Sequence, residues 1–152
     1  MQIHFEGPLL YVSLAGEMDG RLAEKAYREV LRECVAGGRW KMLIDCRGLS
    51  GELSTTDRYS LGKVVADENT SVAAKESGRV VRVALVGNPP FIDRDHFGET
   101  VARNRGAAVK VTHDLESAYR WLGVEPPADD FAHSEASLSH AEPQRRGEEA
   151  LG

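Results

Sequence analysis

The sequence predicts an α/β fold: a single domain with a mainly parallel sheet, an antiparallel N-terminal strand and about four helices. One observation behind this prediction is that short, apolar, β-rich segments alternate with longer segments of helical period. Another is size and composition, because 152 residues with 41% hydrophobic and 28% charged side chains fit one globular domain. The predicted order of elements is β-β-α-β-α-β-α-β-α.

The strands are predicted from apolar runs that end at turn residues. Residues 3–5 and 9–14 flank Gly7-Pro8, a turn signal, so they predict a hairpin that forms the antiparallel edge. The remaining strands are connected through helices, which favours parallel neighbours. They are expected at residues 40–46, 80–86 and 107–112.

A strongly amphipathic helix is predicted after the hairpin. Asp19 is a good N-cap, and Gly37-Gly38 ends the helix. Apolar residues form two adjacent rows at four-residue spacing, while charged residues fill the opposite face, so one side is expected to cover the sheet. The rows are Leu22, Ala26, Val30 and Cys34, and Ala23, Tyr27, Leu31 and Val35.

Three further helices are predicted from their caps and apolar faces. Ser54, with Asp57 three residues later, resembles a capping box in which Asp replaces Glu. That helix is expected to fade between residues 69 and 76. Residues 91–104 suit a third helix, and Asp114 caps the last one.

The net charge of −5 is unevenly spread along the chain. Residues 125–152 carry seven acidic and two basic side chains, so the rest of the chain is neutral. The same segment is rich in proline and poor in apolar side chains, which predicts a disordered acidic tail over 124–152 after a domain at 1–123. A neutral domain with an acidic tail argues against a nucleic-acid partner, because phosphate binding needs a basic surface.

The chain is expected to be cytoplasmic. No apolar run approaches the ~20 residues that cross a bilayer, and the N-terminal MQIHFEG has no signal-peptide pattern. Cys34 and Cys46 form no CxxC pair, so both are read as reduced, buried thiols. A homodimer is left open.

Enzyme and metal signatures are sparse. The sequence has no GxSxG, GxxxxGK[ST] or GxGxxG motif. Asp93, Asp95 and His96 are metal-ligand types, but they fit a capped helix start better, and the other histidines are scattered without an evident carboxylate partner. No metal site and no cofactor are expected. Asp45 ends a central strand, where parallel sheets collect functional groups, although it can equally bind the amides that follow it.

The run LIDCRGLSGELSTTDRYSLG resembles the central strand, loop and helix of STAS domains, a family named for sulphate transporters and anti-sigma-factor antagonists. In that family an aspartate ends the strand, and an Asp-Ser pair opens the helix. Asp45 matches the aspartate and Ser54 matches the serine. Leu53 stands where the family has the second aspartate, and Thr55 and Thr56 replace its glycine.

A closer resemblance is to the bacterial STAS-like branch, also described as CRAL-TRIO-like, that is related to the sporulation anti-sigma-factor antagonist. VRVALVGNPP and ARNRGAAVKVTHDLESAYRWLG are similar to the ending of that branch, so the resemblance covers residues 1–123. It implies a STAS-like fold and a non-enzymatic regulatory or protein-interaction module.

The docking surface would be the loop at 47–53 and the helix start that follows it. A phosphate there would add about −1.5 to −2 charge to the surface and so switch binding. Ser54, Thr55 and Thr56 are the phosphorylation candidates, and the partner- or ligand-binding candidates are Asp45, Arg47, Ser50, Glu52, Leu53, Asp57 and Arg58.

The alternative function is a carrier of a small apolar or lipid-like ligand, which the CRAL-TRIO resemblance implies. Its pocket would lie between the sheet and the helices at 57–66 and 91–104. A stripe of Phe91, Phe97 and Val101 fits such a pocket, and it fits plain core as well. An enzyme, resting on Asp45 and the hydroxyl cluster, is a third hypothesis.

Overall fold

The computed structural model of the chain describes residues 1–127. It contains one sheet in the order β1-β2-β3-β4-β5, in which β1 and β2 are antiparallel and every other pair is parallel. The predicted single-domain α/β fold with an antiparallel N-terminal strand is therefore confirmed. The strands are β1 (Gln2–Glu6), β2 (Leu9–Glu17), β3 (Lys41–Ser50), β4 (Arg82–Val86) and β5 (Ala108–Thr112).

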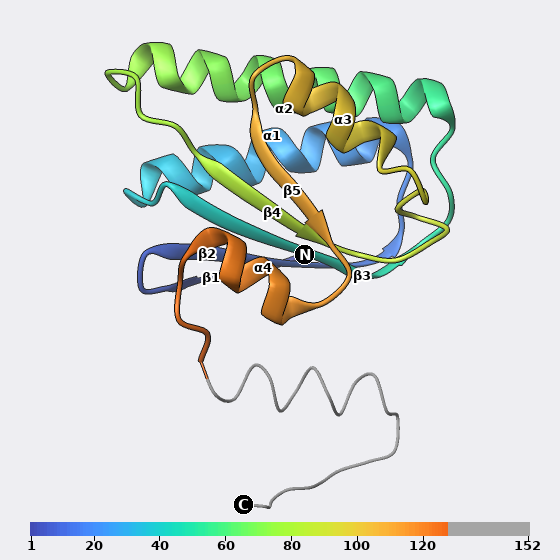
Figure 1. Cartoon of the computed structure of the whole chain (residues 1–152), viewed down its shortest axis with the longest axis horizontal. Coiled ribbons are helices and arrows are strands. Elements are labelled where there is room, and N and C mark those ends of the chain that lie inside the picture. The colour runs from blue at the N-terminus through green and yellow to red at the C-terminus, as the bar shows by residue number, and fades with distance from the viewer. Residues whose placement is uncertain (128–152) are drawn as a thin grey trace, which may run out of the picture.

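The helices form two layers around this sheet. Because successive parallel strands are added in one direction, right-handed crossovers place their connecting helices on the same face. Figure 1 shows α1, α2 and α3 together on one face and α4 on the other. The helices are α1 (Gly20–Ala36), α2 (Thr55–Lys75), α3 (Phe97–Asn104) and α4 (Leu115–Leu122).

Each face of the sheet has its own apolar core. Alternate strand residues point to opposite faces. On the three-helix face, strand residues such as Val12 and Ile44 pack with Val30 and Leu31 of α1. On the other face, strand residues such as Leu43 pack against Leu115, Ala118, Tyr119 and Leu122 of α4.

The predicted helix caps are confirmed. The side chains of Asp19, Ser54 and Asp114 accept hydrogen bonds from the backbone N–H groups of Leu22, Asp57 and Ser117. Each bond satisfies a donor that the first turn of a helix would otherwise leave unpaired. Leu22 itself departs from the predicted apolar row, because its side chain is 50% exposed.

The third strand is longer than predicted. Residues 47–50, expected to begin a loop, continue β3 and pair with the extended end of β2 after a bulge between Ser13 and Ala15. Gly48 permits this pairing, since a Cβ atom there would lie 2.8 Å from the carbonyl oxygen of Leu14. A glycine within the segment expected to form a loop instead permits close contact between strands.

The third helix is shorter than predicted, and it starts at Phe97 rather than at residue 91. His96 has φ 52° and ψ 50°, a left-handed conformation that cannot continue a right-handed helix. The Asp93 carboxylate accepts from the Phe97 N–H at 3.0 Å and so caps the helix from the preceding turn. Local hydrogen bonding by Asp93 replaces the expected first turns.

The sequence also predicted a tail and no membrane-spanning helix. From residue 128 onward, the predicted tail lies outside the residues that the structure describes. Within residues 1–127, no helix is both long and apolar enough to cross a membrane.

The close contact between α2 and α3 provides a test of the packing. A Cβ atom on Gly62 would lie 2.6 Å from the Gly98 carbonyl oxygen, whereas one on Gly98 would meet nothing nearer than the Arg58 oxygen at 3.5 Å. Gly62→Ala should therefore lower the free energy of unfolding by about 1–3 kcal/mol. Gly98→Ala should leave it unchanged or raise it by up to about 1 kcal/mol. Urea unfolding of both variants makes the comparison, and equal effects would contradict the close approach.

Candidate functional site

An apolar cavity of about 110 Å³ lies between the sheet and the three-helix layer. It occupies the place where the resemblance implied a pocket, between the sheet and residues 57–66 and 91–104. Phe91 lines it, but Phe97 and Val101 of the suggested stripe do not. The lining includes Val12, Ile44 and Val111 of the sheet, Ala26 and Val30 of α1, Leu61, Gly62 and Val65 of α2, and Gly98 and Ala102 of α3.

The cavity follows from how the helices pack on one another. The helix α2 packs mainly against α1 and α3 rather than against the strands. Small side chains face the space below it, among them Ala26 and Ala102. The apolar atoms that line this unfilled space lack packing partners on one side, which lowers stability.

A buried polar link keeps α2 in this position. Tyr27 of α1 donates its hydroxyl hydrogen to the Asn69 side-chain oxygen of α2, and Asn69 Nδ2 donates to the Val81 carbonyl at 3.5 Å. Burial raises the pKa of Tyr27, which keeps the phenol protonated and able to donate. The link joins two helices and the segment before β4.

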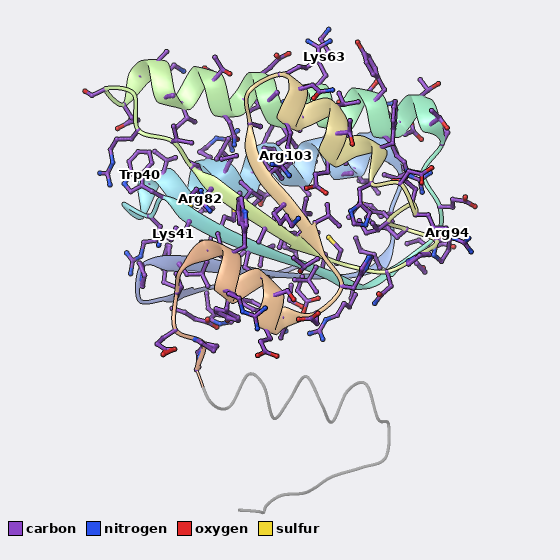
Figure 2. All side chains as sticks on the ribbon, in the orientation of Figure 1. Trp40, Lys41, Lys63, Arg82, Arg94 and Arg103 are labelled. Atoms are coloured by element: carbon purple, nitrogen blue, oxygen red, sulfur yellow. The ribbon has the colours of Figure 1, made fainter. Side chains whose placement is uncertain are left out.

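The cavity has a polar rim near the start of α2. Arg58 Nε lies 3.6 Å from the Asp93 carboxylate, and Arg58 Nη2 donates to the carbonyls of Pro90 at 2.9 Å and Phe91 at 3.2 Å. Figure 2 shows this end of the molecule at Arg94, opposite the end that carries Trp40 and Lys41. Arg58 therefore fixes the segment before α3 against α2.

The predicted hydroxyl cluster is exposed at the start of α2. Ser54, Thr55 and Thr56 are open to solvent, and Ser54 Oγ accepts from the Asp57 N–H at 3.0 Å. The residue before them, Leu53, is 4% exposed and lines the cavity. Leu53, at the position where STAS domains have an aspartate, is therefore part of the cavity wall.

Asp45 and Arg47 lie apart from this cluster. Asp45 is two residues from Leu43, which packs against α4, so its side chain points to the face opposite the cavity. Its carboxylate accepts from Arg47 Nε at 2.9 Å, from Arg47 Nη2 at 2.8 Å and from the Tyr11 hydroxyl at 2.9 Å. The two residues form a buried network of their own.

The electrostatics of Asp45 are set by that network. Burial by itself would raise its pKa, but the hydrogen bonds and positive charge of Arg47, with the Tyr11 bond, hold the pKa below its ordinary value. The same contacts raise the pKa of Arg47. Asp45 is consequently an ionised structural partner of Arg47.

The ten residues named from the sequence therefore do not form one surface. Leu53 and Arg58 line the cavity, while Asp45 and Arg47 lie on the other side of the sheet. Ser50, expected in a loop, belongs to β3, and its hydroxyl donates to the Gly16 carbonyl at 3.4 Å. Glu52 is exposed and Asp57 half-buried beside Ser54. Because β3 continues to Ser50 with a bulge against β2, residues that are close in the sequence lie on different faces of the sheet.

The contacts of the histidines differ in part from those expected from the sequence. His4 contacts Glu6, and His96 lies 3.2 Å from Glu99 and 3.3 Å from His113, so carboxylate partners are present. His113 follows a strand directly, which was the one available signal in the sequence. His133 and His140 lie outside the described residues.

Fold and site together define an α/β protein with a mixed five-stranded sheet and an apolar cavity under one helical layer. No family model and no curated protein matches the sequence.

Among solved structures, the chain is similar to an uncharacterized DUF3478-family protein from Shewanella loihica PV-4, described as having a SpoIIAA-like fold. The match has 21% identity and a TM-score of 0.43, and it covers 80% of this chain and 90% of the other. The description of that protein concerns its fold and says nothing about function.

The depressed pKa of Asp45 predicts how stability depends on pH. A carboxylate whose pKa is lowered by folding stabilises the protein above its unfolded value, near 3.8, and loses that effect as pH falls through the folded value. Asp45→Asn should therefore be less stable than the unsubstituted protein at pH 6. The difference should shrink steadily below pH 4. Urea unfolding across this range measures it, and a difference independent of pH would contradict the assignment.

Proposed function

We propose that the protein binds a small apolar ligand in the cavity between the sheet and the helices α1, α2 and α3. The observation that carries the proposal is the cavity itself, which is lined almost entirely by apolar side chains. Close packing is the rule in protein interiors, and an unfilled space of this size lowers stability. A ligand that fills the space would recover that loss.

The size of the cavity limits the ligand. An apolar cavity of about 150 Å³ accepts benzene, and drug-sized ligands occupy about 300–1,000 Å³. The 110 Å³ of this cavity suit a small ring or the end of an acyl chain, with any larger part of the ligand outside. The charge of Arg58 is already matched by Asp93 at the rim. Shape and apolar contact, rather than charge, would then select the ligand.

The proposed role is binding rather than catalysis. The enzyme hypothesis joined Asp45 to the hydroxyl cluster, yet Asp45 is bound to Arg47 and Tyr11 on the opposite face. Cys46 lines the cavity, but burial raises the pKa of its thiol to about 12, so it is a poor nucleophile.

A second candidate function is a regulatory, protein-interaction module that docks through the start of α2. It is favoured by the exposure of Ser54, Thr55 and Thr56, next to Leu53 in the cavity wall and one turn from Tyr59, which is 43% exposed. A partner or a phosphate at Ser54 would act on the residue beside that wall. The two candidates are compatible, because a ligand under α2 could alter the docking surface.

Filling the cavity tests the first proposal. Val65 of α2 lines the cavity, whereas Val83 of β4 is fully buried and does not. Val65→Phe should change the free energy of unfolding by less than about 1 kcal/mol, while Val83→Phe should cost about 1–3 kcal/mol through overpacking. Equal losses would show that the space cannot accept a side chain.

Ligand binding is then measured directly. Native mass spectrometry of freshly purified protein should show a bound apolar molecule, and added benzene should raise the melting temperature in proportion to its occupancy. Val65→Phe should abolish both effects. If benzene shifts the melting temperatures of Val65→Phe and the unsubstituted protein equally, binding is elsewhere and the proposal is wrong.

Substitutions at Ser54 test the second candidate. Ser54→Ala removes the cap of α2 and should cost about 0.5–2 kcal/mol, whereas Ser54→Asp retains a cap and should keep the stability. In an affinity pull-down, Ser54→Asp should lose a protein partner that Ser54→Ala retains. A partner captured equally by both variants would leave Ser54 as a helix cap alone.

A further inference from the structure

Two histidine side chains meet at the carboxyl ends of β4 and β5. His113 directly follows β5, and His96 is the last residue before α3. Their Nε2 atoms are 3.3 Å apart, their ring centroids are 5.2 Å apart, and the ring planes make an angle of 60°. In parallel sheets this edge is where ligands collect.

These separations fit two ligands of one metal ion. With metal–nitrogen bonds of about 2.0–2.1 Å and a tetrahedral angle, two ligating nitrogens lie about 3.3–3.4 Å apart. The two rings then converge on one point, which places their centroids about 5 Å apart. Both observed values agree with that arrangement.

The outer nitrogen of each ring supports the same assignment. His113 Nδ1 lies 2.7 Å from the Gly87 carbonyl oxygen, and His96 Nδ1 lies 3.2 Å from a Glu99 carboxylate oxygen. A ring nitrogen that faces such an acceptor carries the hydrogen, so the Nε2 atom of a neutral ring presents its lone pair. Two facing lone pairs repel each other unless a proton or a metal ion lies between them. Metal-binding histidines make this type of outer hydrogen bond.

The backbone at His96 is also unusual. Its left-handed conformation, φ 52° and ψ 50°, is uncommon for a residue other than glycine. His96 makes no side-chain cap bond, because Asp93 caps α3 instead. The conformation directs the ring to His113 and Glu99. Strained backbone of this kind occurs at functional sites.

We propose that His96 and His113 bind a divalent late first-row transition metal ion through their Nε2 atoms. Glu99 and the Gly87 carbonyl orient the two rings. Residues 1–127 contain no group of three His, Cys, Asp or Glu side chains that could hold a metal, so solvent completes the coordination. The His96 side chain is 26% exposed, which leaves the site accessible.

The ligand set specifies the kind of ion. Imidazole nitrogen suits Zn²⁺, Cu²⁺ and Ni²⁺, whereas Mg²⁺ and Ca²⁺ prefer oxygen ligands. Affinity should follow the order Cu²⁺ above Ni²⁺ and Zn²⁺, with Mn²⁺ much weaker. The proposal does not depend on an apolar ligand, although His96 also lines the cavity.

The test uses the full chain without an affinity tag. Zn²⁺ is titrated by calorimetry, Mg²⁺ serves as the negative control, and the histidine side-chain nitrogens are followed by NMR. One ion should bind per chain, and the His96 and His113 resonances should shift. His96→Asn, which tolerates the left-handed backbone, and His113→Gln should each weaken binding at least tenfold.

Two further variants complete the experiment. Glu99→Gln, which keeps both ligands, should weaken binding about 10–100-fold, and it carries the test if a histidine variant fails to fold. His4→Gln is the matched control, because His4 is a surface histidine with its own contact to Glu6. It should bind as the unsubstituted protein does.

Three results would overturn the proposal. One is unchanged Zn²⁺ affinity in the His96 and His113 variants. Another is a change of NMR resonances on Zn²⁺ addition that is confined to His133 or His140. The third is no binding of Zn²⁺ at millimolar concentration.

Discussion

The contact between Gly62 of α2 and Gly98 of α3 is the constraint on which the three-helix layer depends. With no side chain on Gly62, the two helix backbones approach each other more closely than any Cβ atom would allow. The helix α2 thereby gains its packing from α3 and α1 rather than from the strands. The space that remains over the sheet is the apolar cavity, so helix–helix contact and the candidate ligand site have one physical origin.

The polar groups of the protein are divided by the sheet. On the α4 side, Asp45, Arg47 and Tyr11 satisfy one another and secure the carboxyl end of β3. On the side of the three helices, Arg58 and Asp93 connect α2 to the segment before α3. The first network is structural, because its charges are paired within the protein. The second borders the cavity, where it also holds the turn that precedes His96.

Local sequence signals predicted most of the fold. Alternating apolar segments, the caps at Asp19, Ser54 and Asp114, and the turn at Gly7-Pro8 act over a few residues, and all of them hold in the structure. The two errors have different causes. Residues 47–50 were expected in a loop, but pairing with the distant strand β2 extends β3 through them. Residues 91–96 were expected to be helical, but the Asp93 carboxylate bonds the Phe97 N–H and α3 begins only there.

The sequence by itself therefore determined the element order and the mainly parallel sheet, because periodicity and capping are local properties. The general position of a pocket came only from the family resemblance. Only the tertiary structure decided which residues share a site. Asp45 and Ser54 are nine positions apart. The alternation of side chains along β3 nevertheless directs Asp45 to the α4 face, whereas Leu53, next to Ser54, lines the cavity on the other face. His96 and His113 are separated by a whole helix and strand, and they meet because parallel strands bring their carboxyl ends to one edge.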